Sequence, residues 1–391
     1  MATPTPLEQL VKTAVTPRQV SIGLPTSLSP AERRFPLTPE AAAMLVDRGF
    51  TVKMESGASE SIHFSDEAYA RHGVVVVDRA EALRCDIVVY LPTVSEADAR
   101  KLKRGALLLG FEHAESRSPG AIRVLLQRSV TAIALDKISD SSGNHPFADI
   151  LREIDGRAAV AIASSLLADA IHGKGILLGG IAGVVPCELT LIGADLAALA
   201  AARSAIGLGA TVRLFDNDIY RLRDLEAAVG PGVIASALHP RVLHSALRTA
   251  DIVIGCSLRR PVEISSEEVG DMKRGVITFD LNHAQSPMFP SMPTVDLALA
   301  SPCDNAPESG QRVCYINAGS AVPRTAAMAL SNTLLTMFED IVACRTALDA
   351  IKINPGLRGA AYTFLGKPVS AEVASLLGMR VVDINLLLQC S

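Results

Sequence analysis

The sequence predicts an α/β fold with two doubly wound, parallel-sheet domains. Short runs rich in Val, Ile and Leu alternate with longer segments of helical period, which is typical of strands buried on both faces of a parallel sheet. These runs form two series, separated by a long helix-like segment and a glycine-rich one. The chain has 391 residues, more than one hydrophobic core usually holds, so two domains are expected.

The first series of apolar runs predicts six strands. They are expected at 20–24, 51–55, 74–77, 86–91, 106–111 and 131–135. A long helix is then expected over 149–171, followed by glycines between 173 and 183 that suit a crossing between domains.

The second series predicts five strands, at 189–192, 211–215, 233–237, 251–255 and 276–281. A helical stretch over 326–348 precedes a tail, 354–388, which could return to the first domain. We therefore expect a discontinuous domain made of 1–150 and 325–391, and a second domain made of 151–324.

Composition excludes several classes of protein. Lys and Arg number 37 against 41 Asp and Glu, a net charge of −4, so nothing favours a nucleic-acid partner. No apolar run is long enough for a transmembrane helix and no secretory signal is evident, so a cytoplasmic protein is expected. The seven cysteines show no metal-ligand spacing, and no metal site is expected.

The segment after 189–192 has the layout of a dinucleotide-binding βαβ unit of the Rossmann type. Gly193 and Ala194 begin the turn, and Asp216 follows the next strand, where an acidic residue binds a ribose diol. Asp195 stands where that motif has a second glycine, which lets the backbone approach the pyrophosphate. Asp195 could simply cap the following helix, or it could mark an altered phosphate site, and both can hold together.

Motifs along the chain resemble those of the alanine dehydrogenase and transhydrogenase alpha-subunit family. The turn Arg34 to Pro39 is similar to that family's arginine-bearing turn, and the string GALLLGFEH, 105–113, to its strand ending in a histidine. The linker-helix segment 153–157, the glycines of 173–180 and the string NAGSAVPRT, 317–325, also match. The resemblance implies a substrate cleft between two domains, with NAD as cofactor and a homo-oligomeric assembly.

The same resemblance assigns roles to three residues and shows three losses. It implies that Arg34 clamps a substrate carboxylate, that His113 hydrogen-bonds the reacting carbonyl or imine, and that Asn317 lies beside the nicotinamide. The family's substrate lysine is missing from the string YLPTV after 86–89, and its catalytic aspartate falls on Ala284. A serine that contacts the cofactor falls on Arg152.

His283 and Tyr90 are the nearest candidates for replacement acid or base groups, and Arg152 could receive a phosphate or a carboxylate. We expect an NAD(P)-dependent oxidoreductase that acts on an amino acid or its imine or keto acid. Because the lysine and the aspartate are both missing, we expect its substrate to differ from pyruvate. Asp216 favours NAD, while Arg213 and Arg221 leave NADP possible. The alternative is a non-redox or cofactor-impaired homologue that binds a metabolite or acts as a structural partner.

Overall fold

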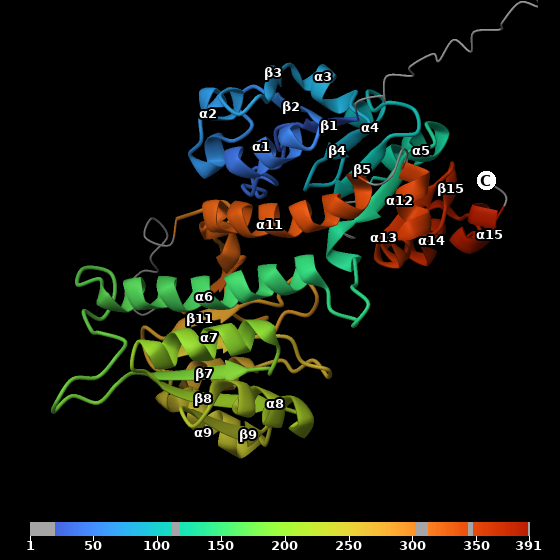
Figure 1. Ribbon diagram of the computed structural model, residues 1–391. Coiled ribbons are helices and arrows are strands. Elements are labelled where there is room, and N and C mark those ends of the chain that lie inside the picture. The colour runs from blue at the N-terminus through green and yellow to red at the C-terminus, as the bar shows by residue number, and fades with distance from the viewer. Residues whose placement is uncertain (1–19, 112–117, 302–311, 343–346, 390–391) are drawn as a thin grey trace, which may run out of the picture.

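The computed structural model describes residues 20–111, 118–301, 312–342 and 347–389. Two α/β units lie one above the other, and the two long helices α6 (Pro146–Ala168) and α11 (Pro323–Val342) run between them (Figure 1). Each unit is built on its own sheet, which we call the first and the second sheet.

The first sheet has the strand order β15-β14-β6-β5-β4-β1-β2-β3. Strands β1 to β6, from the N-terminal part of the chain, are parallel to one another, whereas β14 pairs antiparallel with both β6 and β15. The C-terminal tail therefore contributes two strands to the sheet built by the N-terminal part. The strands are β1 (Ser21–Leu24), β2 (Thr51–Glu55), β3 (Val75–Val77), β4 (Ile87–Val89), β5 (Leu107–Gly110), β6 (Thr131–Ala134), β14 (Ala361–Phe364) and β15 (Lys367–Pro368).

Helices cover both faces of the first sheet. Residues of α1 and α11 share one core with the sheet, and residues of α4 and α5 share the core on the other face. Ser, Thr or Asp side chains cap α1 to α5, which fixes where each helix begins. The helices are α1 (Pro39–Asp47), α2 (Asp66–Ala70), α3 (Arg79–Leu83), α4 (Glu96–Ala99), α5 (Pro119–Gln127), α12 (Ala347–Ile353), α13 (Pro355–Ala360), α14 (Ala371–Leu377) and α15 (Ile384–Gln389), with 3-10 turns η1 (Glu60–Ile62) and η3 (Leu135–Lys137).

The second sheet has the order β12-β13-β11-β10-β7-β8-β9, and its strands are all parallel. The order reverses between β7 and β10, which is where open α/β sheets bind ligands. Its strands are β7 (Glu188–Ile192), β8 (Thr211–Asp216), β9 (Val233–Ala237), β10 (Ile252–Gly255), β11 (Ile277–Asp280), β12 (Thr294–Asp296) and β13 (Cys314–Ile316).

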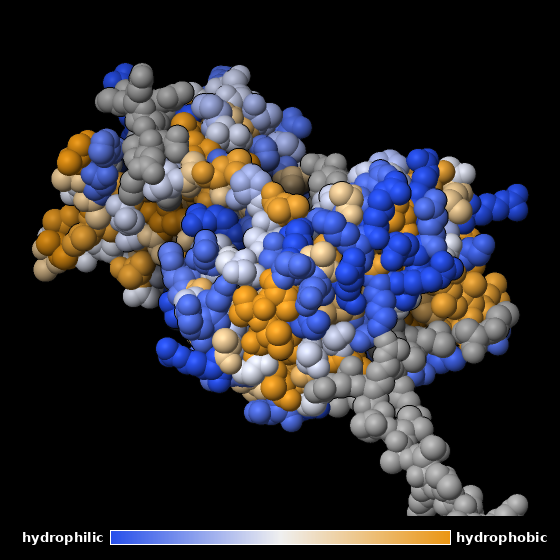
Figure 2. All heavy atoms as spheres, turned by 90° about the horizontal axis from the view of Figure 1, so that it is seen from above, coloured by the Kyte–Doolittle hydropathy of each residue, from blue (hydrophilic) through white to orange (hydrophobic). Residues whose placement is uncertain are grey.

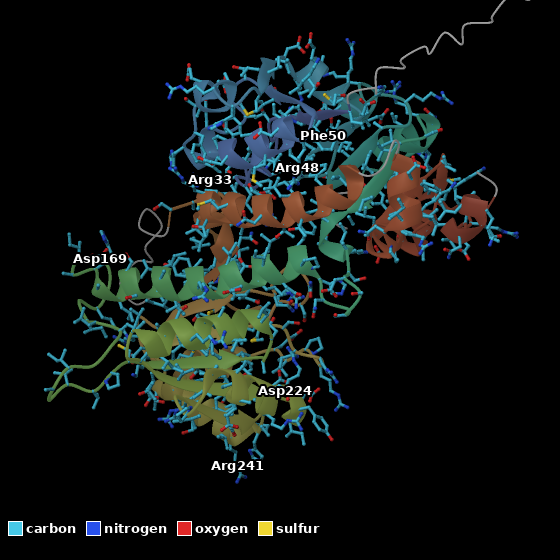
Figure 3. All side chains as sticks on the ribbon, in the orientation of Figure 1. Arg33, Arg48, Phe50, Asp169, Asp224 and Arg241 are labelled. Carbon is cyan, nitrogen blue, oxygen red and sulfur yellow. The ribbon has the colours of Figure 1, made fainter. Side chains whose placement is uncertain are left out.

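Helices also cover both faces of the second sheet. Residues of α6, α7 and α8 pack in one core and residues of α9 and α10 in the other. Side chains labelled on α8 and α9, Asp224 and Arg241, lie at the lower side of the second unit, away from α6 (Figure 3). The helices are α7 (Leu196–Gly207), α8 (Ile219–Val229), α9 (Pro240–Thr249) and α10 (Ser266–Asp271), with the 3-10 turn η4 (Ala318–Ala321).

Helix α6 belongs to the hydrophobic cores of both units. Phe147, near its start, is buried in the core of the first sheet, and Ala158, Ala159, Val160 and Ala163 are buried in the core of the second. A Cβ at Gly156 would collide with the backbone of Ala197, so glycine permits the close packing of α6 on α7. This shared helix holds the ends of the two sheets in a defined relation.

All eleven strands predicted from the apolar runs are present, within two residues at each end. The predicted helix 149–171 is observed three residues earlier, as α6. The structure adds four short strands that the sequence patterns did not indicate, β12 to β15, so the first sheet is mixed at one edge and not wholly parallel. Short strands of two to four residues are too brief for a detectable alternation.

The surface mixes polar and apolar side chains. Figure 2 shows hydrophilic side chains interspersed with separated apolar patches on the face seen from above. Within the described part of the chain, no helix combines the length and the apolar character that crossing a bilayer requires.

Candidate functional site

A cavity of about 170 Å³ lies where the two units meet. It is lined from the loop after β1, from α6, from the loop after β11 and from the segment joining β13 to η4. Its wall includes the charged or polar residues Arg34, Asp155, Asp280, His283 and Asn317, together with Ala284. Of the residues proposed from the sequence, the fold brings Arg34, His283 and Asn317 to one cavity.

Arg34 is held by a buried carboxylate. Its Nε donates to Glu32 Oε1 at 2.7 Å and its Nη2 donates to Glu32 Oε2, while its guanidinium lies 4.9 Å from the ring centre of Phe111. Glu32 is only 7% exposed, and its charge raises the pKa of Arg34 against the opposing effect of burial. A guanidinium has five N–H donors, so those not used by Glu32 remain for a second carboxylate.

Asp155 projects from α6 into the same cavity. Its Oδ1 accepts a hydrogen bond from the backbone N–H of Gly319 at 2.8 Å. Burial raises the pKa of Asp155 to about 6, although the Gly319 hydrogen bond and Arg34 oppose that rise. A carboxyl group that titrates near neutral pH can both accept and return a proton.

Asp280 and His283 form a second pair at the end of β11. Asp280 is 1% exposed and accepts hydrogen bonds from the backbone N–H groups of Met288, at 2.8 Å, and Asn282, at 3.1 Å. His283 Nδ1 lies 3.4 Å from Asp280 Oδ2. Burial raises the pKa of Asp280. The pair orients the His283 imidazole at the cavity wall, next to Ala284.

Asn317 closes the opposite wall through an unusual backbone. It has a φ of 58°, in the left-handed region that asparagine tolerates, and its Nδ2 donates to Asp296 Oδ1 at 2.8 Å. Gly319 follows in η4, and any side chain there would collide with Asp155. Backbone shape thus brings the Asn317 segment and α6 into direct contact.

The turn after β7 has the tight geometry of a dinucleotide site. Gly193 has a φ of 107°, and a Cβ there would lie 2.8 Å from the carbonyl carbon of Cys256. Asp195 caps α7, accepting from Ala198 N at 3.0 Å through Oδ1, and its Oδ2 accepts from Ser257 N at 3.1 Å. Both readings of Asp195 are consistent with this position, because the cap places a carboxylate at the helix N-terminus that a phosphate would otherwise approach.

Asp216 stands at the end of β8, next to the same turn. Its carboxylate is fully buried and accepts from Ala194 N at 2.7 Å and from Asp218 N at 2.8 Å. Arg221 lies 3.4 Å from it and also donates to the carbonyl oxygen of Ser257 at 3.0 Å. A ribose diol would therefore reach Asp216 only by replacing one of these protein contacts.

The crevice therefore fits the frame of a dinucleotide. Gly193 lies where the motif needs its tight turn, and Asp216, at the end of β8, lies where the motif has its ribose-binding carboxylate. Asp195 instead places a negative charge where the pyrophosphate would lie. Bound there, a pyrophosphate needs the Asp195 carboxylate to leave the N-terminus of α7. Arg213 points its charge elsewhere, with Nη2 3.7 Å from Glu188 Oε1.

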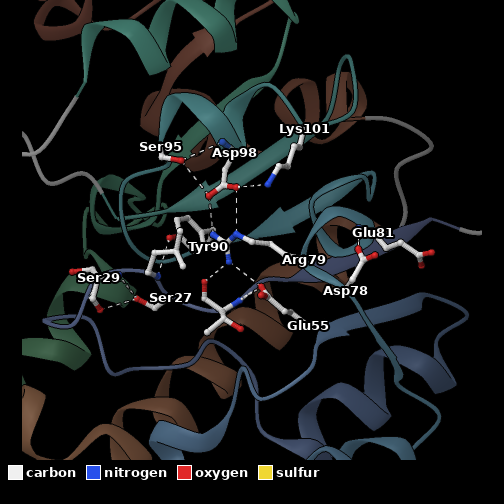
Figure 4. Close-up of polar contacts among 12 residues, drawn as sticks. Ser27, Ser29, Glu55, Asp78, Arg79, Glu81, Tyr90, Ser95, Asp98 and Lys101 are labelled. Atoms are coloured by element: carbon white, nitrogen blue, oxygen red, sulfur yellow. Dashed lines mark hydrogen bonds and ion pairs between the residues drawn. The ribbon is translucent and has the colours of Figure 1, made fainter.

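Tyr90 lies outside the cavity. It is 4% exposed, its hydroxyl accepts from Leu28 N at 3.3 Å, and Arg79 lies 5.6 Å from its ring centre. Arg79 in turn pairs with Glu55 and Asp98 (Figure 4). The hydroxyl is thus part of a structural network in the first unit, and we leave Tyr90 out of the chemistry proposed below.

Two further residues expected at the site have different outcomes. His113 lies outside the described residues. Arg152 is half-buried on α6, does not line the cavity, and acts on Asp155 only as a favourable charge.

Sequence reasoning did not single out Asp155 or Glu32. Asp155 was visible only as one of several charged residues in the linker-helix segment, beside Glu153 and Arg157, and such residues are usually solvated. Glu32 was visible only as an acidic residue two positions before the arginine. The described residues contain no cluster of three or more His, Cys, Asp or Glu side chains able to hold a metal ion.

Comparison with known proteins places this architecture in a family. Residues 23–151 match the N-terminal domain model of alanine dehydrogenase/PNT, and residues 159–371 match its C-terminal domain model. An alanine dehydrogenase of Mycobacterium tuberculosis is 29% identical over 376 residues, covering 93% of this chain and 98% of that protein. Another, from Staphylococcus saprophyticus, is 28% identical over 372 residues, with the same coverage of 93% and 98%.

Solved structures agree with this assignment. An L-alanine dehydrogenase superposes with a TM-score of 0.80 at 27% identity, covering 92% of this chain and 99% of that one. A transhydrogenase from Sinorhizobium meliloti gives a TM-score of 0.73 at 20% identity, covering 90% and 99%, and shows the shared fold alone. The two-sheet fold, the second of Rossmann type, and both domain models together show that the chain belongs to the alanine dehydrogenase/PNT family.

Proposed function

We propose that the protein is an NAD(P)-dependent oxidoreductase that acts on an amino acid or on its imine or keto acid, with a substrate other than the alanine and pyruvate pair. One observation carries this proposal: Arg34, Asp155, the Asp280 and His283 pair, and Asn317 all border one small cavity between the two units. A volume of about 170 Å³ suits a small metabolite.

Arg34 would bind the substrate carboxylate. Glu32 occupies Nε and one side of Nη2, which leaves the outer edge of the guanidinium for a second carboxylate. His283, held by Asp280, would donate to or accept from the reacting carbonyl or imine. The missing lysine and the alanine at 284 argue for a substrate that differs from that of the alanine dehydrogenases.

The Rossmann unit would hold the cofactor. Gly193 gives the turn, Asp216 the ribose-binding carboxylate, and Asn317 the wall at the substrate end. When bound, the nicotinamide supplies or accepts a hydride. NAD is favoured over NADP, because the Asp216 carboxylate would repel a 2′-phosphate and Arg213 and Arg221 are both engaged by carboxylates. A cytoplasmic homo-oligomer remains our expectation for its location and assembly.

A titration of the purified protein with NADH and with NADPH, followed by nucleotide fluorescence up to millimolar concentration, tests this proposal. Saturable binding that is lost in Asp216→Ala is the expected result. Amino acids are then supplied one at a time with NAD, and the appearance of NADH is followed by absorbance. Absence of binding by either nucleotide would reject the proposal.

A second candidate function is a non-redox homologue that binds a metabolite or acts as a structural partner. The specific observation in its favour is that Asp195 and Arg221 both join the turn after β7 to Ser257, across the place where a pyrophosphate would lie. Carboxylate binding by Arg34 without nucleotide binding would support this candidate.

A further inference from the structure

The cavity has a charge pattern that selects its ligand. Glu32 neutralises Arg34, and the two together are one ion pair. Asp155 and Asp280 add two carboxylates, and His283 is the other titratable group at the wall. In the described part of the chain no Lys or Arg forms an ion pair with Asp155, since Arg34 and Arg152 act on it only from longer range.

The geometry of Asp155 keeps one of its oxygens for a ligand. Gly319 N donates to Oδ1 at 2.8 Å, and this contact fixes the carboxyl plane against η4. A Cβ at 319 would lie 2.4 Å from Oδ1, so a larger residue there would displace the Asp155 carboxylate. Oδ2 has no hydrogen-bond partner among the described residues, and Asp155 borders the cavity that Arg34 also borders. A carboxylate and a guanidinium therefore stand on two sides of one small space.

We propose that Asp155 is a catalytic residue that binds the cationic nitrogen of the substrate and exchanges a proton with it, while Arg34 holds the substrate carboxylate. This inference rests on the proposed function and adds to it the residue that would act on the substrate nitrogen. A ligand with a second carboxylate in place of the nitrogen is disfavoured, because Asp155 and Asp280 would repel it.

The proton step is simple and balanced. The N–H bond of the substrate ammonium breaks, its electron pair stays on nitrogen, and an O–H bond forms at Asp155 Oδ2, which leaves a neutral amine and a neutral carboxyl group. The reverse step protonates the amine. The raised pKa of Asp155 suits both directions near neutral pH.

The groups around Asp155 come from four other places in the chain. Arg34 faces it from the loop after β1, Asp195 from the start of α7, Gly319 N from η4, and Arg152 from the preceding turn of α6. The positive charges of Arg34 and Arg152 favour the ionised form of Asp155, whereas the negative charge of Asp195 favours its neutral form. Binding a cationic nitrogen adds a positive charge and favours the ionised form.

The test uses L-alanine as a small probe that carries the α-ammonium and carboxylate groups shared by all α-amino acids, and not as the proposed substrate. It is compared with propionate, which has the same carbon chain and no amino group. Calorimetric titrations at pH 8 are made with the wild-type chain and with Asp155→Asn, in the absence of nucleotide. Glu153→Gln is the matched control, because Glu153 lies on the same helix and its carboxylate pairs with Arg157 at the surface. Circular dichroism checks that each variant is folded.

The wild-type chain and Glu153→Gln are expected to bind L-alanine about tenfold more tightly than propionate, and Asp155→Asn to lose that preference while keeping its affinity for propionate. Equal binding of the two ligands by the wild type, an unchanged preference in Asp155→Asn, or no binding of either ligand would each overturn the inference. Because no nucleotide is present, these results do not depend on whether the protein transfers a hydride.

Discussion

The carboxylate of Asp195 accepts a hydrogen bond from the backbone N–H of Ser257 at 3.1 Å, and this bond joins the turn after β7 to the loop after β10. These two strands are the neighbours between which the strand order of the second sheet reverses. A side chain of the protein thus spans the place that the dinucleotide-binding motif leaves open with its second glycine. If the crevice binds a nucleotide as proposed, we expect its affinity to depend on this contact.

Asp195→Gly is therefore expected to tighten NADH binding by about tenfold or more, because a negative charge leaves the phosphate position. Glycine is itself a tolerated helix cap, so stability should fall by only a few tenths of a kcal/mol. Fluorescence titration measures the affinity. Ser265→Gly, which removes the cap of α10, is the control and should leave the affinity unchanged. Unaltered or weaker binding in Asp195→Gly would mean that its carboxylate does not obstruct the nucleotide.

Arg34→Lys is expected to weaken the binding of L-alanine by about tenfold or more, because an ammonium cannot pair with Glu32 and a ligand carboxylate through parallel N–H bonds. The lost pairing should also lower the free energy of unfolding by about 1–3 kcal/mol, since Glu32 stays buried. Calorimetry and urea denaturation measure the two effects. The neighbouring Arg33 is exposed, so Arg33→Lys should change neither quantity. If both variants bind alike, Arg34 is not the carboxylate site.

Asp155→Asn is expected to raise the free energy of unfolding above pH 6. The pKa of Asp155 is about 6 in the folded state and near 4 when unfolded, so ionising it opposes folding. The stabilising effect of the neutral form is complete below pH 4 and is lost as the pH rises through 6. The gain in the variant should be at most about 3 kcal/mol at pH 8 and should vanish near pH 4.

Urea denaturation of the wild-type chain and Asp155→Asn at several pH values between 4 and 8 measures this difference. Glu153→Gln should follow the wild type, because the Glu153 side chain is partly exposed and already paired with Arg157. A constant difference across this range would show that Asp155 does not titrate there.

Gly193→Ala is expected to destabilise the second unit by several kcal/mol. The backbone has a positive φ that disfavours any side chain, and the added Cβ would press on the backbone of Cys256. Gly207→Ala is the matched control, because Gly207 is the last residue of α7 and has open space around it. This substitution should stabilise the protein by up to about 0.5–1 kcal/mol. Thermal denaturation of both variants measures the contrast, and a small effect at Gly193 would contradict the tight turn.

The order of elements follows from the sequence, because each buried parallel strand needs a continuous apolar run and each helix needs its own period and cap. Strands such as Thr51–Glu55 and Val233–Ala237 are therefore found at the predicted residues. Gly193, Asp195 and Asp216 were also found from spacing alone, because the βαβ turn is a local motif. The strands of the tail, β14 and β15, are too short to show a pattern. They become visible only in the structure, where β14 pairs with β6 and β15 pairs with β14.

The sequence by itself determined the two doubly wound units and the turn after β7, since these depend on neighbours in the chain, while the resemblance to the family indicated Arg34. Tertiary structure decided which groups meet. It brought Asp155 and Gly319, 164 positions apart, to within 2.8 Å, turned Asp216 inward against Ala194, and left Tyr90 in another network. The physical reason is that a helix shared by two cores fixes which of its faces borders the cavity, and no local pattern records that choice.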